Sequence, residues 1–114
     1  MEPTLSELTA ILRQFRDERD WAQFHTPRNL ATALSVEAAE LLEPFQWLAG
    51  EAELTPEARQ AVTAEMADVL SYLLLLADRM QVDLADALQA KVRTNAEKYP
   101  ADQVRGSSRK YDQY

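Results

Sequence analysis

The sequence predicts an all-α protein. Only two of its 114 residues are glycines, Gly50 and Gly106, and β-branched residues do not gather into the alternating runs typical of strands. Threonine and aspartate residues instead precede apolar residues that recur every three or four positions. Apolar residues make up 46% of the chain, which is enough for the core of one small domain. We therefore expect a single domain built as a four-helix bundle.

The first helix is expected from about Leu5 to Arg19. Thr4 and Glu7 have the spacing of a capping box, in which each side chain accepts a hydrogen bond from the other residue's backbone N–H. Apolar residues then follow at helical intervals and give the helix one apolar face. They are Leu5, Leu8, Leu12 and Phe15.

A second helix is expected to begin at Thr26 and Pro27, because threonine is a favoured N-cap and proline suits the first helical position. It should run toward Trp47. Pro44 interrupts it, since a proline removes one backbone hydrogen bond and clashes with the preceding turn. We therefore expect a kink, or the end of the helix, just ahead of Phe45.

The pair Thr55-Pro56 repeats the same pattern and predicts a third helix that reaches about Met80. Asp83 is expected to cap a fourth helix. Pro100 must stop this helix at or before Tyr99, because a proline disfavours helical backbone at the residue that precedes it.

The chain becomes polar and basic after Pro100. We assign residues 1–100 to the helical domain and residues 101–114 to a basic C-terminal tail, which we expect to be mobile until something binds it. Closure of this tail over a ligand as a lid is a further hypothesis, and a disordered tail is the simpler alternative. Its basic residues are Arg105, Arg109 and Lys110.

Charge and composition narrow the class of function. A formal net charge of −7 disfavours binding to a nucleic-acid backbone, so a polyanionic ligand would need bridging cations. The chain has no cysteine, which excludes a disulfide framework and a thiolate zinc site. The N-terminus lacks the features of a signal peptide, and no segment is expected to be long and apolar enough to span a bilayer. We expect a cytoplasmic protein with no membrane partner.

The predicted third helix is apolar on nearly every side from Val69 to Leu76. A surface helix of a small bundle normally has one apolar stripe, so a domain of this size cannot bury that whole circumference alone. We therefore expect a homo-oligomer in which this helix is central.

The predicted second helix carries carboxylates on its apolar side. Glu37 continues the stripe of Leu30, Leu34 and Leu41, and Glu40 lies three residues further along the same face. An unpaired ionised carboxylate is costly to bury, so such a residue normally has a cation or hydrogen-bond donors beside it.

The predicted third helix repeats this arrangement, since Glu65 interrupts the stripe from Val62 to Leu76 and Asp68 neighbours Tyr72. If the two helices pack antiparallel, four carboxylates converge, and divalent cations relieve their repulsion most simply. Oxygen ligands favour Mg²⁺, with Mn²⁺ as a substitute. Solvated carboxylate pairs are the alternative. A di-iron centre would need Glu-x-x-His motifs, and His25 lies outside both acidic motifs.

The two acidic motifs resemble the hallmark of a known superfamily. Glu37-Ala-Ala-Glu40 followed by Glu65-Met-Ala-Asp68 is similar to the paired motifs of the MazG-like, all-α nucleoside triphosphate pyrophosphohydrolases. Further strings resemble the dCTP pyrophosphatase branch in particular, and together they cover nearly the whole chain. They lie at residues 16–21, 24–30, 45–47, 95–100 and 105–107, and at Lys110-Tyr111.

The resemblance implies a fold, an activity and an assembly. The fold would be the four-helix bundle of the all-α pyrophosphohydrolase type, assembled as a homotetramer. The activity would be Mg²⁺-dependent hydrolysis of dCTP, or a modified dCTP, to the monophosphate and pyrophosphate, in nucleotide-pool sanitation. The metal ligands would be Glu37, Glu40, Glu65 and Asp68.

The resemblance also implies substrate contacts. Trp21 and Trp47 would stack on the nucleobase, although both could be ordinary core or interface aromatics. His25 would line the pocket, or else cap the following helix. Contacts to phosphate or sugar would come from one face of the fourth helix, whose C-terminus also favours positive charge for structural reasons. The assigned residues are Lys91, Asn95 and Tyr99, with Tyr72 beside the acidic motif.

Three residues are candidates for catalysis. Glu40 or Glu65 would act as general base for the attacking water, and Lys91 would stabilise charge that develops on the phosphates. Pro44 departs from the family pattern, which leaves the placing of Trp47, and hence base selectivity, open.

Three other functions stay open from the sequence. An enzyme of the same fold could act on dUTP or phosphoribosyl-ATP. A nucleotide-binding module would bind triphosphate and Mg²⁺ without turnover. A structural helical oligomer would have no metal affinity.

Overall fold

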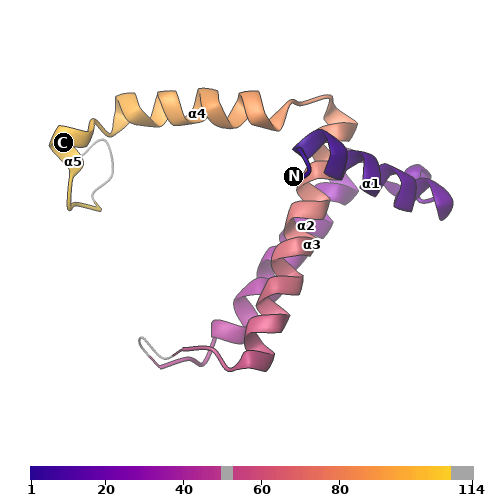
Figure 1. Cartoon of the computed structure of the whole chain (residues 1–114), viewed down its shortest axis with the longest axis horizontal. Coiled ribbons are helices and arrows are strands. Elements are labelled where there is room, and N and C mark those ends of the chain that lie inside the picture. The colour runs from indigo at the N-terminus through magenta and orange to yellow at the C-terminus, as the bar shows by residue number, and fades with distance from the viewer. Residues whose placement is uncertain (50–52, 109–114) are drawn as a thin grey trace. The chain divides into compact units, whose positions relative to one another are not determined.

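The computed structural model describes residues 1–49 and 53–108 (Figure 1). Over these two ranges the secondary structure is helical and includes no strand, so the predicted all-α class is confirmed. The helices are α1 (Leu5–Glu18), η1 (Ala22–Phe24), α2 (Pro27–Leu42), η2 (Glu43–Phe45), α3 (Pro56–Met80), α4 (Leu84–Lys98) and α5 (Ala101–Val104).

Each of the four long helices begins where the sequence predicts, because a side chain caps its first turn. Thr4 Oγ1 accepts a hydrogen bond from the Glu7 N–H at 3.1 Å, and the Glu7 carboxylate accepts one from the Thr4 N–H at 3.1 Å. The other three caps satisfy backbone N–H groups that have no partner inside the helix. They pair Thr26 with Asn29, Thr55 with Ala58, and Asp83 with Asp86.

Pro44 ends α2, as predicted. The α-helix stops at Leu42, and the chain continues through the 3₁₀ turn η2. Because proline lacks an N–H and crowds the preceding turn, it cannot extend the α-helical hydrogen bonding. Phe45 and Trp47 therefore follow on a turn, where 41% and 87% of their surface is exposed.

The C-terminal ends of α3 and α4 also fall where expected. α3 ends at Met80 because Gln81 adopts left-handed backbone with φ 58°, and the Val82 N–H returns to the Ala77 carbonyl at 2.8 Å. α4 ends at Lys98, shortly before Pro100.

The short helix α5 lies in the predicted tail and was not anticipated from the sequence. Its first residues follow Pro100, whose carbonyl accepts hydrogen bonds from Gln103 at 3.0 Å and Val104 at 3.1 Å. Of the residues singled out above, Gly50, Arg109, Lys110 and Tyr111 lie outside the described ranges. The predicted boundary between a domain of residues 1–100 and a tail of residues 101–114 stays a prediction.

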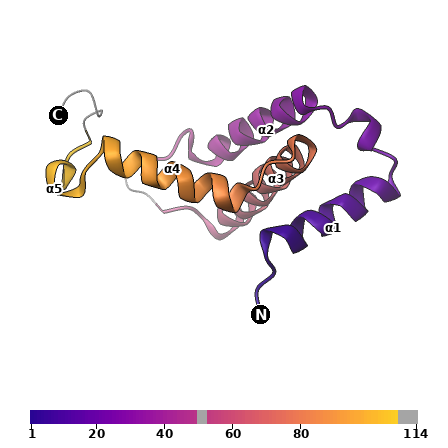
Figure 2. The same cartoon turned by 90° about the horizontal axis from the view of Figure 1, so that it is seen from above.

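The chain divides into two compact units, Met1–Val82 and Asp83–Tyr114. In the first unit α2 and α3 lie side by side and antiparallel, and α1 contacts α3 (Figures 1 and 2). The core lies between these helices, and Leu30 is its most deeply buried residue at 2% exposure. α3 contributes Val62, Leu74, Leu75 and Ala77.

The helix α3 contradicts the expectation that no segment is long and apolar enough to span a bilayer. Its 25 residues are long and apolar enough to cross a membrane, with a mean hydropathy of 1.3 over the relevant window, although only 17% of that window is buried. A helix at the centre of a soluble protein has the same properties. Several of its large side chains are left uncovered in the single chain. They include Met66, Leu70 and Leu73, which are 57%, 41% and 36% exposed.

Candidate metal centre

Three carboxylates from the antiparallel pair of helices converge, as predicted. Glu37 extends from α2, and Glu65 and Asp68 extend from α3, three residues apart on neighbouring positions of one face. One oxygen from each of the three lies within 4.8 Å of the other two. A single divalent cation is small enough to contact all three oxygens after modest side-chain rotation, since Mg²⁺–oxygen distances are about 2.1 Å.

Two of these carboxylates each have one buried oxygen without a hydrogen-bond partner. Glu37 and Glu65 are half-buried, and the Oε2 atom of each is covered from solvent without any donor beside it. Buried carboxylate oxygens normally receive hydrogen bonds or bind a cation, because an unpaired charge is costly to remove from water. The two orphaned oxygens therefore indicate a position that a cation would fill.

The electrostatics of the cluster agree with this interpretation. The pKa of Glu37 is raised from its ordinary 4.5 to about 7, first by the adjacent Glu65 carboxyl, with which a proton on Glu37 can be shared, and then by burial. The neighbouring Glu40 carboxyl, and repulsion by the charges of Glu40 and Glu65, raise it further. Without a cation the cluster can lower its repulsion by holding a proton on Glu37.

The donor set fits a hard divalent cation. All the candidate ligands are carboxylates, and the single histidine of the chain, His25, precedes α2. Mg²⁺ and Mn²⁺ prefer such oxygen ligands, whereas zinc and copper sites usually include nitrogen or sulfur. The described side chains can therefore hold a divalent metal.

Glu40 is the fourth predicted ligand. It lies one helical turn beyond Glu37 on α2, is half-buried, and is close enough to influence the Glu37 pKa. It does not belong to the group whose oxygens lie within 4.8 Å of one another. Its role as ligand or general base stays a prediction.

The two tryptophans predicted to stack on a base are accessible. Trp21 is 44% exposed, and its ring packs edge-to-face on Phe15 with ring centroids 5.8 Å apart. The Arg19 guanidinium covers Phe15 at 3.6 Å from the ring centroid. Trp47 is 87% exposed, so neither tryptophan is a core residue of the single chain. Their contact with a base stays a prediction.

His25 does not cap α2, because the side chain of Thr26 makes that hydrogen bond. The Nδ1 atom of His25 is instead buried without a hydrogen-bond partner. The pKa of His25 is lowered, mainly by burial and further by the positive charge of Arg16. Tyr72 is half-buried one turn beyond Asp68 on α3. The substrate-binding roles of His25 and Tyr72 stay predictions.

The predicted phosphate and sugar contacts lie in the second unit, Asp83–Tyr114. Lys91 and Asn95 occupy exposed positions one turn apart on α4, and the Asn95 carbonyl accepts the Tyr99 N–H at 2.8 Å. Lys91, Asn95 and Tyr99 therefore share one helix face or its end, and their roles stay predictions.

The comparisons with known proteins place the chain in a family. The model of the MazG-like family matches residues 32–113, a range that contains both acidic motifs. The chain belongs to the MazG-like family. The resemblance noted from the sequence is thereby confirmed.

Individual relatives are also similar to this MazG-like protein over most of its length. It is 46% identical to dCTP pyrophosphatase 1 of Homo sapiens over an alignment of 114 residues, which covers 96% of this chain and 67% of the human protein. The chain is 45% identical to the protein of the same name from Bos taurus, and the alignment covers 68% of that protein. A crystal structure of a pyrophosphatase from Archaeoglobus fulgidus DSM 4304 superposes with a TM-score of 0.81 at 43% identity, covering 88% of this chain and 95% of that chain.

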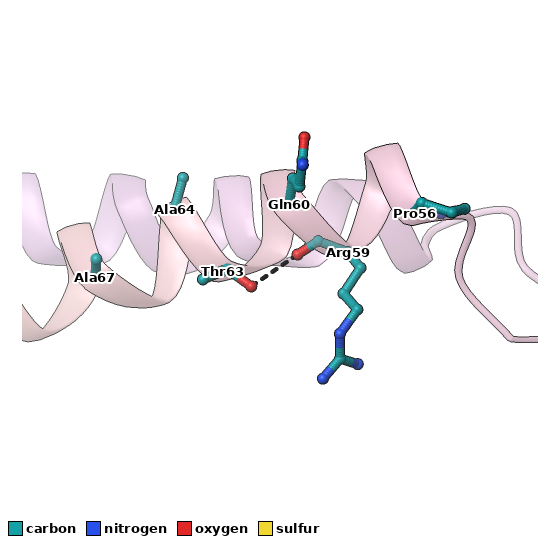
Figure 3. A pocket seen from close by; sticks show the side chains of 6 residues that line it. All are labelled: Pro56, Arg59, Gln60, Thr63, Ala64 and Ala67. Carbon is teal, nitrogen blue, oxygen red and sulfur yellow. Dashed lines mark hydrogen bonds between the residues drawn. The ribbon is translucent and has the colours of Figure 1, made fainter.

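A shallow hollow on α3 of this MazG-like protein is separate from the carboxylates (Figure 3). It has a volume of about 530 Å³, and Thr63, whose hydroxyl donates to the Arg59 carbonyl at 2.9 Å, forms part of its wall. None of the four predicted metal ligands lines it. Its lining residues are Pro56, Arg59, Gln60, Thr63, Ala64 and Ala67.

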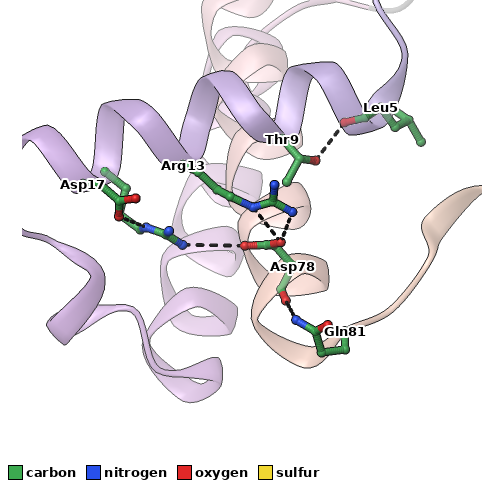
Figure 4. A network of polar contacts seen from close by, with 7 residues as sticks. Leu5, Thr9, Arg13, Asp17, Asp78 and Gln81 are labelled. Atoms are coloured by element: carbon green, nitrogen blue, oxygen red, sulfur yellow. Dashed lines mark hydrogen bonds and ion pairs between the residues drawn. The ribbon is translucent and has the colours of Figure 1, made fainter.

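An ion-pair network between α1 and α3 of this MazG-like protein was not predicted from the sequence (Figure 4). Arg13 and Arg16 extend from α1 toward Asp78 near the end of α3. The spacing of the two arginines, three residues apart, places them on one face of α1. A carboxylate beside the long apolar run of α3 was the only indication of their partner in the sequence.

Proposed function

We propose that this MazG-like protein is a Mg²⁺-dependent nucleoside triphosphate pyrophosphohydrolase that acts on dCTP, or a modified dCTP, in nucleotide-pool sanitation. The observation that carries the proposal is the convergence of Glu37, Glu65 and Asp68, with buried partnerless oxygens on two of them. The names of the relatives, dCTP pyrophosphatase 1, supply the substrate class and the reaction.

The proposed metal ligands are Glu37 and Glu40 from α2 and Glu65 and Asp68 from α3. When bound there, Mg²⁺, or Mn²⁺ in its place, supplies positive charge to phosphate oxygens and lowers the pKa of a coordinated water. Four carboxylates exceed the charge of one cation, so the centre has the capacity to hold more than one.

The protein's own groups would then orient and activate the reactants. Glu65 keeps a buried oxygen with no donor beside it, and Glu40 lies next to Glu37, so either can accept a proton from a water held at the cluster. Attack at phosphorus would break the α–β phosphoanhydride bond and release pyrophosphate. The lost proton would pass to the carboxylate that served as base.

Other residues would bind the nucleotide. The exposed rings of Trp21 and Trp47 offer flat faces for a base, and His25 and Tyr72 would line the pocket. The second unit would supply positive charge and hydrogen bonds to phosphate and sugar. Its contributors would be Lys91, Asn95 and Tyr99.

We also propose a cytoplasmic homo-oligomer, a tetramer, in which α3 is central. The exposure of Met66, Leu70 and Leu73 in the single chain supports this assembly, since a soluble protein normally buries such a patch. The net charge of −7 argues against a nucleic-acid partner, and burial of α3 within an oligomer would leave no need for a membrane. The working domain would comprise residues 1–100, with residues 101–114 as a basic tail.

The test is release of monophosphate and pyrophosphate from a panel of deoxynucleoside and ribonucleoside triphosphates, with Mg²⁺ and with EDTA. We expect metal-dependent turnover that favours dCTP and disappears in Glu37→Gln. Preference for dUTP or for phosphoribosyl-ATP would instead indicate an enzyme of the same fold that acts on a different substrate.

Absence of turnover with every substrate would contradict the proposal. Binding assays then separate the remaining functions. Affinity for triphosphate and Mg²⁺ without turnover would indicate a nucleotide-binding module. Absence of metal affinity would indicate a structural oligomer.

A further inference from the structure

The ion-pair network between α1 and α3 is centred on Asp78 (Figure 4). Asp78 Oδ1 accepts hydrogen bonds from both Nε and Nη2 of Arg13, the first at 3.0 Å. Its Oδ2 lies 3.6 Å from Arg16 Nη1. The Asp78 and Arg16 side chains are only 15% and 18% exposed, so solvent screens this pair less than an ordinary surface ion pair.

Apolar contact attaches α1 only in part, since Leu8 and Leu12 are half-buried rather than buried. Thr9 is its one buried residue, and the Thr9 hydroxyl bonds within the helix to the Leu5 carbonyl at 2.8 Å. Ile11 and Phe15 remain 60% and 48% exposed. The hydrogen bonds of Arg13 and the ion pair of Arg16 with Asp78 therefore contribute strongly to the position of the C-terminal half of α1 against α3.

Trp21 is fixed to that half of α1. The Arg16 carbonyl accepts the N–H groups of Arg19 at 3.2 Å and of Trp21 at 3.1 Å. The Trp21 ring packs edge-to-face on Phe15, at an interplanar angle of 70°. Arg19 covers Phe15 and donates to its carbonyl at 2.9 Å. The same residue, Arg16, thus binds Asp78 through its side chain and Trp21 through its backbone.

The turn after Trp21 is also hydrogen-bonded to α2. The Trp21 carbonyl accepts the Phe24 N–H at 2.9 Å, and the Ala22 carbonyl accepts the His25 N–H at 3.1 Å. The Asn29 side chain then donates to the Phe24 carbonyl at 2.9 Å. Residues 21–25 are therefore bonded at both ends, to α1 and to α2.

We propose that Asp78 is a positioning residue which, by holding Arg16, sets the position of Trp21 relative to the carboxylates of α3. Asp78 and Asp68 lie ten residues apart on one continuous helix, roughly 15 Å along its axis. A helix is rigid over this distance. Asp78 therefore links Trp21, the predicted base-stacking residue, to the same helix that carries Glu65 and Asp68. The inference rests on the proposed function for the identity of the ligand that Trp21 meets.

The first test follows Trp21 without any nucleotide. In the full chain carrying Trp47→Phe, Trp21 is the one remaining tryptophan, and acrylamide quenching of its fluorescence reports its surroundings. We expect Asp78→Asn to raise the quenching constant about twofold, since Trp21 is already partly exposed in the intact protein. Asp78→Glu, which keeps the charge, should restore part of the difference.

Asp17→Asn is the matched control. It also removes a carboxylate that binds Arg16, at 2.8 Å, but this partner is exposed and lies on α1 itself. It should leave Trp21 quenching unchanged. If Asp78→Asn fails to fold by circular dichroism, Arg16→Gln breaks the same pair from the other side. Unchanged quenching in the variant that folds would overturn the proposal.

The second test uses steady-state kinetics in the chain with both tryptophans. Because a base–aromatic stack contributes about 1–3 kcal/mol, we expect Asp78→Asn to raise KM for dCTP about fivefold or more. The kcat and the affinity for Mn²⁺ should stay within about twofold of the wild type. Equal losses of kcat and metal affinity would overturn the positioning role, because they would indicate general disruption.

The two tests separate this inference from the proposed function. If the wild type hydrolyses no triphosphate, the proposed function fails, and the quenching experiment still decides whether Asp78 positions Trp21. If the wild type hydrolyses dCTP and Asp78→Asn alters neither quenching nor KM, the proposed function stands and the positioning role is wrong.

Discussion

Glu37 of α2 and Glu65 of α3 meet across the antiparallel helix pair, and each keeps one carboxylate oxygen buried without a hydrogen-bond donor. Two like charges in this position repel one another, and their partial burial strengthens the repulsion. The fold maintains them together because α2 and α3 make the most extensive helix contact in the first unit. Such an arrangement is stabilised by whatever supplies positive charge at this point, either a proton or a cation.

Replacement of Glu37 by glutamine should strongly weaken metal binding without unfolding the protein. The amide keeps the shape of the side chain, removes one negative charge and can donate a hydrogen bond to Glu65. We expect the affinity for Mn²⁺, measured by calorimetry, to fall by about two orders of magnitude, while the Tm of the metal-free protein stays equal or rises.

Glu57→Gln provides the comparison for that experiment. Glu57 is an exposed carboxylate in the first turn of α3 and lies outside the cluster. Its replacement changes the net charge by the same amount and should leave Mn²⁺ affinity unchanged. An equal loss of affinity in both variants would mean that the cation binds through general charge attraction.

Protons and the cation should compete at the cluster, because the pKa of Glu37 is raised to about 7. Between its ordinary value of 4.5 and about 7, the folded metal-free protein holds a proton that the unfolded chain has released. The stabilising contribution of that proton is complete below pH 4.5 and is lost as pH rises through about 7. We therefore expect metal affinity to increase with pH through the same range, because the bound cation displaces the proton.

Calorimetry in buffers of different ionisation enthalpy measures this exchange. Near pH 6 the binding of Mn²⁺ should release about one proton per site, and near pH 8 about none. Proton release that did not depend on pH would contradict the assignment of the shifted pKa to the metal cluster.

The fold could be predicted from local patterns because each helix start is encoded within a few residues. Thr4, Thr26, Thr55 and Asp83 all act as the caps that the sequence indicated, and Pro44 ends α2 as expected. The helix α5 was missed because its four residues are too few for a periodic pattern. The prediction that no segment is long and apolar enough to span a membrane was wrong for α3. The charges of this helix lie near its ends and on one face, so they interrupt its long apolar run less than expected.

The candidate site could be predicted in part. Convergence of Glu37, Glu65 and Asp68 followed from two short motifs on helices that had to pack together. The link from Arg16 to Asp78 could not be found in the same way, because the partners are 62 positions apart and surface arginines have many alternative partners. Pairings of this kind depend on tertiary structure alone.

Truncation of Leu30 should strongly destabilise the first unit. Leu30 is 2% exposed between α2 and α3, and Leu30→Ala removes its packing and leaves a cavity. We expect a loss of about 2–5 kcal/mol in the free energy of unfolding, measured with urea. Ile11→Ala, at a position that is 60% exposed, should cost less than about 1 kcal/mol. A smaller effect at Leu30 than at Ile11 would be inconsistent with this packing.

The exposed apolar side chains of α3 should be covered in solution by other copies of the chain. Light scattering combined with size-exclusion chromatography should give a tetramer for the wild type. Met66→Glu would place a charge in the interface and should shift the mass toward smaller species. A monomer in the wild type at micromolar concentration would disprove the proposed assembly.

The attachment of α1 has a further consequence for local unfolding. Arg13 and Asp78 are 65 positions apart, whereas the caps and turns of α1 are entirely local. Because no apolar side chain of α1 is fully buried, α1 can detach from α3 while remaining helical, at a lower free energy than global unfolding. Backbone amides of α1 should therefore exchange with deuterium earlier than those around Leu30 and Leu74. The ring of Trp21 would move with α1 in each such opening, so the stability of this one helix would determine how often the proposed base-binding side of the site is intact.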